Sequence, residues 1–355
     1  MKNHYPVKFH SAKLDATNLS HFSSQQNKSI MNQDVYTRFR TAISRFALAL
    51  LTVLLTVGLG SVTSELKAQI YVDADAVGNN DGTTWADAYT DLAVAIDMNC
   101  PGGGELWVAE GTYYPTTGTV RAESFDLCDN LELYGGFDGT ETMRSERDFV
   151  TNITILSGDI QQNGSAYDRS YNVITAISAG GNAVLDGFTI SDGAANGTSG
   201  VNSEGGGLHV GNFALTIGSC VFDGNIGKRG GAIYFENSVN SVIQDTEIKN
   251  GSASVRGGAI YFTSTSTVEI SNSMIDGLSA GDGGGLWIEN SSDVTLTNST
   301  ISNCEATGTG GGIYAFNSTL DINTNSEINT NSAIFYGGGV YVIGGQFSIS
   351  QTSFS

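Results

Sequence analysis

Proline is scarce in this 355-residue sequence, which has 3 prolines against 46 glycines, and the glycines follow no three-residue period. A collagen-like triple helix is therefore excluded, because it needs glycine at every third position and abundant proline. Histidine is scarce as well: three of the 4 lie before the apolar run described below, which leaves His209 alone. One isolated histidine supports neither a histidine-based metal cluster nor a Ser-His-Asp triad.

Basic residues are few, at 16 Lys or Arg against 36 Asp or Glu, which gives a formal net charge of −20. They are concentrated near the N-terminus, so residues 69–355 hold 8 of them beside 33 acidic residues. Nucleic acid is disfavoured as a partner, because neutralising phosphates needs a basic surface. The charge suits solubility outside the cell and cation binding, and calcium is a candidate cation without a specific motif to support it.

The N-terminal region contains an apolar run, FALALLTVLLTVGLGSV at 46–62, that follows three arginines. A basic flank, an apolar stretch and then Ala68 are typical of a signal peptide, so residues 1–68 are assigned to this region. Met31 would give a more ordinary basic segment and is a candidate for the true start. At 17 residues the run is short for a membrane-spanning helix, although an uncleaved anchor is an alternative.

The predicted export sets the expected location of the mature protein, which would begin near Gln69. It is expected to be secreted or to lie at the cell surface, in a bacterium at the outer membrane. Membrane contact is expected only through export or through a C-terminal anchor absent from the sequence. The last repeat stops within a coil at Ser355, which predicts that the native protein continues.

One repeat dominates residues 181–355: a glycine pair, a small residue, an aliphatic, an aromatic and an apolar residue, as in GGAIYF. The aliphatic position recurs every 25 to 27 residues, at Leu208, Ile233, Ile260, Leu286, Ile313 and Val340. A second apolar series occupies Ile190, Phe222, Ile248, Ile275, Ile301, Ile328 and Phe354. A third precedes it by five residues in most coils, at Leu185, Ile217, Ile243, Ile270, Leu296 and Ile349. In one coil Ile322 stands six residues before Ile328, which predicts a one-residue bulge.

Within each repeat the apolar residues alternate with period two, which indicates strands and excludes helical repeats. Short strands, Gly/Asn/Ser/Asp turns and a 26-residue period predict an all-β fold, a single solenoid in the form of a right-handed parallel β-helix. The glycine pair would turn a corner with positive φ and close backbone approach. Residues 69–180 are predicted to form a cap and irregular first coils, with a short N-terminal capping helix at 86–98, and residues 181–355 the regular coils.

The register also bears on the four cysteines, since export permits disulfides. Cys100 and Cys128 are a candidate pair. Cys220 and Cys304 would lie about three rungs or roughly 14 Å apart. A disulfide needs Cα atoms within about 7 Å, so these two are predicted to stay unpaired.

Two stretches resemble known families. The opening, IYVDADAVGNNDGTTWADAYTDLAVAID with GGGELWVAEGTYYP, resembles secreted right-handed β-helix proteins of the pectin-lyase-like class. The GGAI-type repeats, with one FxxN element at 222–225, resemble the repeats of chlamydial polymorphic outer membrane proteins, although FxxN occurs once rather than in every coil. The resemblance covers residues 70–355 and implies surface display, adhesion or contact with glycans.

The sharpest surface feature follows from the register, because the residue between two inward positions must point outward. That position is aromatic in every coil of the repeat, and we name it the aromatic column: His209, Tyr234, Tyr261, Trp287, Tyr314 and Tyr341. Stacking that stabilises the sheet is one interpretation, worth about 0.5–1.5 kcal/mol per pair. A binding strip for sugar rings or a partner surface, formed by the five residues from Tyr234 to Tyr341, is the other.

A second outward column, named the corner column, consists of Glu204, Arg229, Arg256 and Asp282. It is interpreted as a surface ion-pair ladder, or as an arginine pair, Arg229 with Arg256, that contacts a ligand carboxylate. A further candidate is a calcium loop, because the spacing of three acidic residues resembles one: Asp73, Asp75 and Asp81. The sequence does not match the EF-hand pattern, so these carboxylates are expected to act in turns and at strand ends. No catalytic or metal-ligating residue is predicted.

The preferred function is therefore an exported or cell-surface β-helix protein, non-catalytic and adhesin-like, that binds glycans or another surface. The expected partners are a polysaccharide or a host or cell surface. One alternative is a polysaccharide lyase or glycoside hydrolase of the pectin-lyase-like class, although no acidic calcium cluster beside the arginines can be assembled. The other is a passive structural stalk, for which a solenoid suffices.

Overall fold

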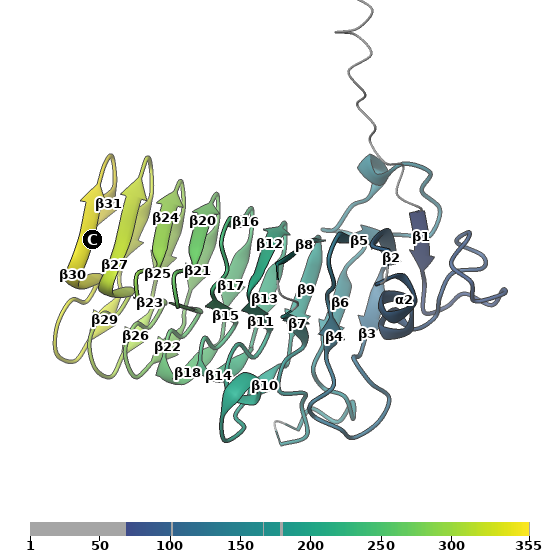
Figure 1. The fold of residues 1–355 in the computed structure, drawn as a ribbon, viewed down its shortest axis with the longest axis horizontal. Coiled ribbons are helices and arrows are strands. Elements are labelled where there is room, and N and C mark those ends of the chain that lie inside the picture. The colour runs from purple at the N-terminus through teal and green to yellow at the C-terminus, as the bar shows by residue number, and fades with distance from the viewer. Residues whose placement is uncertain (1–68, 101, 166, 178–179, 355) are drawn as a thin grey trace, which may run out of the picture. The chain divides into compact units, whose positions relative to one another are not determined.

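The computed structural model describes residues 69–100, 102–165, 167–177 and 180–354. Over these residues the chain winds into a stack of coils whose neighbouring strands pair in parallel (Figure 1). The predicted signal region, 1–68, lies outside the described residues. In the described part of the chain, no helix has the length and apolar character needed to cross a membrane.

The strands form four ladders, each with one strand per coil. The first ladder contains β4 (Phe125–Asp126), β7 (Ile174–Ala176), β11 (Leu208–Gly211), β15 (Ile233–Glu236), β19 (Ile260–Thr263) and β23 (Leu286–Glu289). The second contains β1 (Gln69–Val72), β2 (Gly104–Ala109), β5 (Leu131–Phe137), β8 (Gly181–Asp186), β12 (Phe213–Gly218), β16 (Ser241–Gln244), β20 (Thr267–Ser271) and β24 (Asp293–Thr297). Both join one 16-stranded sheet, because two long strands run through them: β27 (Ile313–Asn323) and β30 (Val340–Ile349).

The other two ladders are separate sheets. The third contains β3 (Gly111–Tyr113), β6 (Thr154–Ser157), β9 (Phe188–Ser191), β13 (Val221–Asp223), β17 (Glu247–Lys249), β21 (Met274–Asp276), β25 (Thr300–Ser302), β28 (Glu327–Asn329) and β31 (Ser353–Phe354). The fourth contains β10 (Ala194–Ala195), β14 (Ile226–Arg229), β18 (Ser252–Arg256), β22 (Ser279–Ala280), β26 (Glu305–Ala306) and β29 (Ser332–Ala333). The described helices are α2 (Leu92–Asn99) and two short 3-10 turns, η2 (Arg144–Glu146) and η3 (Gly200–Ser203).

The predicted register is confirmed along the first ladder. The residues of the aliphatic series are successive Cα partners from Leu208 to Val340. Up to Ile313 they lie in one continuous core with the other two series, whose last members, Ile349 and Phe354, are exposed. The predicted bulge is wrong: Ile322 pairs with Leu296 in unbroken register. The extra residue lies in the turn 324–326, between β27 and β28, which is one residue longer than the turn 298–299 of the preceding coil.

The glycine corners behave as predicted. Gly257 has φ of 64°, in the left-handed region that favours glycine. A Cβ placed on the next residue, Gly258, would lie 2.1 Å from the Gly284 oxygen of the following coil. The turns after the second ladder use Asn or Asp in the same left-handed conformation, as at Asp245 and Asn298. Their short polar side chains tolerate that conformation, which explains why asparagine is frequent and proline rare.

Polar side chains inside the coils join one rung to the next. The backbone N–H of Thr246 donates to the Ser273 hydroxyl at 3.2 Å, and that of Ser273 donates to the Ser299 hydroxyl at 3.1 Å. The FxxN asparagine, Asn225, donates to the Ile190 carbonyl oxygen at 2.8 Å and accepts from the Gly193 N–H at 2.9 Å. Buried backbone groups at the turns are satisfied in this way.

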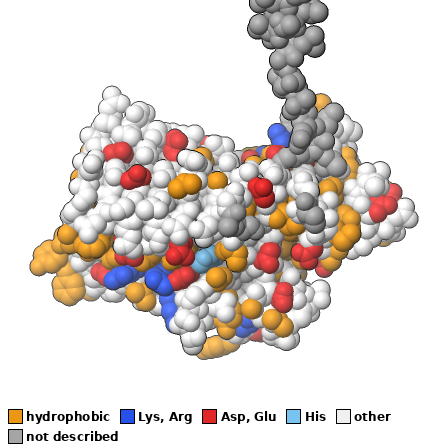
Figure 2. All heavy atoms as spheres, in the orientation of Figure 1, with side chains coloured by type: hydrophobic (Ala, Val, Ile, Leu, Met, Phe, Trp, Pro, Cys, Tyr) orange, Lys and Arg blue, Asp and Glu red, His pale blue; other side chains and the backbone are white. Residues whose placement is uncertain are grey.

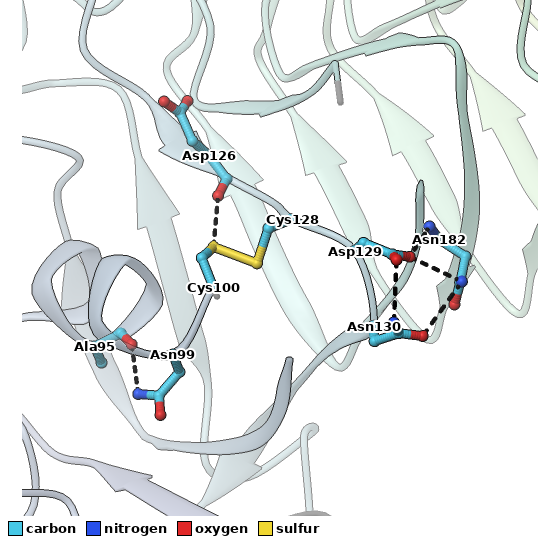
Figure 3. The surroundings of a disulfide bond; sticks show 8 residues. All are labelled: Ala95, Asn99, Cys100, Asp126, Cys128, Asp129, Asn130 and Asn182. Carbon is cyan, nitrogen blue, oxygen red and sulfur yellow. Dashed lines mark hydrogen bonds between the residues drawn. A yellow bond between two sulfur atoms is a disulfide. The ribbon is translucent and has the colours of Figure 1, made fainter. Parts of the chain in front are cut away.

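The N-terminal cap begins later than the apolar spacing predicts. Helix α2 starts after Asp91, whose carboxylate accepts from the backbone N–H groups of Ala93 and Val94, instead of at residue 86. Upstream, the Tyr89 N–H donates to the Tyr71 oxygen of β1, and the Tyr89 oxygen accepts from the Asp73 N–H. These bonds hold the segment in a β-bridge to β1 rather than in a helix. After α2, Cys100 forms a disulfide with Cys128 across a Cα separation of 5.4 Å (Figure 3). A sequence separation of 28 residues predicts a stabilisation of about 3.6 kcal/mol from the lower entropy of the unfolded chain.

Candidate functional site

The aromatic column lies where the register predicts, on the outer side of the first ladder. His209, Tyr234, Tyr261, Trp287, Tyr314 and Tyr341 are successive Cα partners. Tyr234, Tyr261 and Trp287 form an aromatic cluster with Tyr314 that is separate from the main core. Neighbouring ring centroids lie 4.9, 5.2, 6.3, 4.0 and 5.4 Å apart, with the rings stacked except for the tilted last pair.

The N-terminal half of the aromatic column is nevertheless covered. The exposed fractions of Tyr234, Tyr261 and Trp287 are 3%, 1% and 4%. Each ring is covered by the rings above and below it and by the guanidinium groups of the corner column. Arg229 lies 5.7 Å from the Tyr261 centroid, and Arg256 lies 4.3 Å from the Trp287 centroid. The faces of these three rings are therefore unavailable to a sugar in this structure.

One carboxylate satisfies the polar edges of two covered rings. Glu289 accepts from the Tyr261 hydroxyl at 2.5 Å and from the Trp287 indole N–H at 2.9 Å. It stands two residues after Trp287 on the same strand, so the period-two alternation of β23 already indicated that it points outward too. The sequence interpretation did not use that signal.

The C-terminal end of the column is more open. Tyr314 and Tyr341 are half-buried. Tyr336, from the turn before β30, stacks on Tyr341 at 5.8 Å and is 66% exposed, and its neighbour Phe335 is 68% exposed. Figure 2 shows hydrophobic side chains gathered at this end of the coil stack. Arg256 covers the ring of the next coil, Trp287, but the corner residue one coil before Tyr314 is Asp282, which is too short to cover an aromatic ring.

The corner column also keeps its predicted register, with Glu204 bridging to Arg229, Arg229 paired with Arg256, and Arg256 bridging to Asp282. Its ion pairs differ from a simple ladder. Arg229 makes a short ion pair with Glu204, but Arg256 lies 3.8 Å from Glu289, and the Asp282 carboxylate accepts from the Thr309 N–H at 2.9 Å. Each of these ion pairs joins a partly exposed arginine to a carboxylate that is largely buried.

Burial shifts the protonation of the groups at the N-terminal end of the column. It lowers the pKa of His209 to about 4, which leaves the imidazole neutral at pH 7. Burial also raises the pKa of Glu204, against the opposing effect of Arg229. The pKa of Tyr261 rises to about 12, mainly through burial and then through its hydrogen bond to Glu289. Perturbed groups brought together in this way are typical of functional sites, although structural networks produce them as well.

The remaining candidates have local structural roles. Asp73 accepts from the Asp75 N–H at 2.9 Å, and Asp81 accepts from the Thr83 N–H at 3.1 Å, as expected for turns. Among the described residues, no group of three or more His, Cys, Asp or Glu side chains is arranged to hold a metal ion. Cys220 and Cys304 are unpaired and buried, and burial raises the pKa of each thiol to about 12.

Comparison with known proteins identifies the fold. The family model described as "Right handed beta helix region" matches residues 176–354. No curated protein matches the sequence. Two solved structures are similar. The mannuronan C-5 epimerase AlgE4 A-module of Azotobacter vinelandii has 13% sequence identity and a TM-score of 0.30, and the match covers 80% of this chain and 97% of that chain. PfbA, a surface adhesin of Streptococcus pneumoniae, has 13% identity and a TM-score of 0.28, with 81% of this chain and 93% of that chain covered. At these TM-scores neither structure supports a conclusion about this chain, and the fold is identified by the family model.

Proposed function

The chain belongs to the right-handed β-helix family, and from that premise we propose that it is an exported, cell-surface protein that binds a glycan or another surface without catalysing a reaction. The observation that carries this proposal is the accessible ring of Tyr314 in the aromatic column. Tyr314 is half-buried although it lies between Trp287 and Tyr341 of the two neighbouring coils, so its free surface is a feature of the column itself. Exposed aromatic patches of this kind on soluble proteins mark interaction sites.

The covered half of the column gives the open half a rigid support. Tyr314 stacks on Trp287 at a centroid distance of 4.0 Å, and Trp287 is held by Glu289 and Arg256. Tyr side chains positioned in this way give large contact area at low entropic cost and dominate many binding energies. A solenoid repeats the arrangement from coil to coil, which suits an extended ligand such as a glycan chain.

Surface display is supported by sequence features. The signal-like run at 46–62, outside the described residues, favours export. The resemblance of the repeats to polymorphic outer membrane proteins favours a place at the bacterial outer membrane. The FxxN asparagine braces two neighbouring rungs, and Asn331 repeats its contacts by donating to the Ile301 oxygen at 2.8 Å and accepting from the Cys304 N–H at 2.9 Å. This bracing is independent of any ligand.

Binding of the purified protein to a glycan array and to cells tests the proposal. Tyr314→Ala and Tyr336→Ser are each expected to weaken binding about tenfold, the effect of losing one aromatic anchor. Tyr167→Ala is the matched control, because Tyr167 is exposed and lies in the irregular coils. If neither variant differs from the control on a ligand that the wild type binds, the open end is not the binding face. Failure of the wild type to bind any glycan or cell would favour the passive stalk.

A polysaccharide lyase or hydrolase is the second candidate. It is favoured by the neutral His209 and the buried Glu204, which lie beside Arg229 at one end of the column. His209 Nδ1 is 3.3 Å from the Glu204 carbonyl oxygen, and the imidazole stacks on Tyr234. A screen of polysaccharides for unsaturated or reducing-end products would detect such an activity. Turnover that is lost in Arg229→Ala would overturn the non-catalytic proposal.

A further inference from the structure

We propose that a pocket beside the covered half of the aromatic column binds one oxyanion group, a carboxylate or a sulfate ester, carried by the ligand. The inference deepens the proposed function and rests on it for the identity of the ligand as a glycan. It depends on a cavity of about 390 Å³ between η3 and the ends of β14 and β18. Its lining residues are Thr198, Ser199, Gly200, Ser203, Lys228, Arg229, Val255 and Arg256.

The lining carries three cations and no carboxylate. This concentration is exceptional for the chain, because residues 181–355 hold four basic residues, and three of them line this one pocket. Figure 2 shows Lys and Arg side chains gathered in one group on the face where the fourth ladder meets the first. The fourth basic residue, Lys249, is on β17 of the third ladder and pairs with Glu247 at 2.8 Å.

Two of the three cations have unused hydrogen-bonding capacity. Lys228 makes one long contact, 3.4 Å, from its ammonium group to the Thr198 carbonyl oxygen. The Arg256 Nε–H is buried without a hydrogen-bond partner in the described structure, and Arg256 Nη1 is 3.8 Å from the nearest carboxylate oxygen, on Glu289. Arg229, in contrast, is paired with Glu204. A cation that is weakly paired or unpaired within the protein gains a charge-assisted bond when an oxyanion enters the pocket.

The surroundings limit the ligand to sparse negative charge. With 33 acidic residues beyond position 68, the field of the protein repels a densely charged polyanion at long range. The lining of the pocket, in contrast, is cationic. A short-range site of this kind suits an isolated acidic group on an otherwise neutral ligand chain. The arginines can form charge-assisted hydrogen bonds with that group, and Thr198 and Ser199, which also line the pocket, carry hydroxyl groups.

Titration of the exported protein with sodium sulfate and, separately, with sodium glucuronate at constant ionic strength tests the pocket by calorimetry. We expect saturable binding of at least one anion, and the anion that binds distinguishes a sulfate ester from a carboxylate. Lys228→Gln and Arg256→Gln should each raise the Kd about tenfold. The control Lys249→Gln removes the same charge outside the pocket and should change the Kd less than about twofold, because remote charges are screened.

Two results would overturn the proposal: absence of saturable binding beyond a sodium chloride reference, or equal weakening by Lys249→Gln. Lys228→Gln guards against a folding artefact, since Lys228 has no described contact with the aromatic column, whereas Arg256 covers Trp287. The pocket and the proposed function can fail separately. Anion binding by a protein that binds no glycan supports the pocket alone, and glycan binding without anion saturation overturns the pocket alone.

Discussion

The two halves of the aromatic column have the same register and the same residue types, yet one half is covered and the other is accessible. Tyr234, Tyr261 and Trp287 are almost fully buried, whereas Tyr314 and Tyr341 are half-buried. The difference comes from the corner column, in which the residue of one coil covers the ring of the next coil. Arg229 lies over Tyr261 and Arg256 over Trp287, but the corner residue one coil before Tyr314 is Asp282. Long side chains with apolar stems cover aromatic surface well, and aspartate cannot.

The two halves of the aromatic column are therefore expected to have different roles, one in stability and one in ligand binding. In the covered half, ring stacking, cation–π contacts and the bonds to Glu289 are all made within the protein, so its contribution is to stability. In the accessible half, the same rings keep free surface that a ligand can use. Substitutions in the covered half should therefore change stability, and substitutions in the accessible half should change binding.

The largest expected effect is loss of stability on truncating a covered ring. Tyr261→Ala should lower the free energy of unfolding by about 3–5 kcal/mol, the range for large aromatic truncations in buried sites. Tyr341→Ala should lower it by about 1 kcal/mol, because Tyr341 is half-buried and surface changes have small effects. Denaturant unfolding followed by circular dichroism would measure both. Equal losses for the two variants would mean that coverage does not distinguish the halves.

Alkaline pH should weaken the covered half next. The pKa of Tyr261 is raised from its ordinary 10.0 to about 12, so the folded state favours the neutral phenol. The stability linked to this group is complete below pH 10 and is lost as the pH rises to about 12, a loss of up to about 2 kcal/mol. Tyr261→Phe should reduce the fall in unfolding free energy across that interval without abolishing it, because burial also raises the pKa of Tyr234. A variant with the wild-type slope would show that Tyr261 is not the group responsible.

Glu289→Gln should have a smaller effect than either. The side chain keeps its shape but loses the charge that strengthens its bonds to the Tyr261 hydroxyl and the Trp287 indole, a loss of about 1–2 kcal/mol in unfolding free energy. Glu236→Gln is the matched control, since Glu236 occupies the corresponding strand position two coils earlier. A control that loses as much stability as Glu289→Gln would point to a general charge effect.

The fold was largely predictable because one position in each coil determines the others. Gly-Gly before Ile260, with period-two alternation after it, sets the corner, the strand and the facing of Tyr261 together. The start of helix α2 was not predictable from apolar spacing, because Asp91 caps the helix and Tyr89 pairs through its backbone with Tyr71. Backbone pairing of that kind leaves no mark in side-chain periodicity.

The site was predictable in position but not in exposure. Register shows that Trp287 points outward, but whether it meets solvent depends on where the Arg256 guanidinium lies and on which groups Glu289 accepts from. Those directions are set by side-chain packing between coils, which a single sequence does not display. The sequence indicated Arg229 and Arg256 as a carboxylate contact but not Lys228 or the wall formed by η3, whose residues lie 25 or more positions before Lys228 in the chain.

The smallest effect on stability should come from the accessible half, at Tyr336. Tyr336→Ser should change the unfolding free energy by no more than about 0.5 kcal/mol, since the ring is 66% exposed and contacts Tyr341 at its edge of the column. The same variant is expected to weaken ligand binding, so it separates the two roles within one residue. Thermal unfolding beside glycan-array binding measures both quantities. If Tyr336→Ser lowers the unfolding free energy as much as Tyr261→Ala does, Tyr336 contributes to stability like the covered rings. The two halves of the column would then not differ in role.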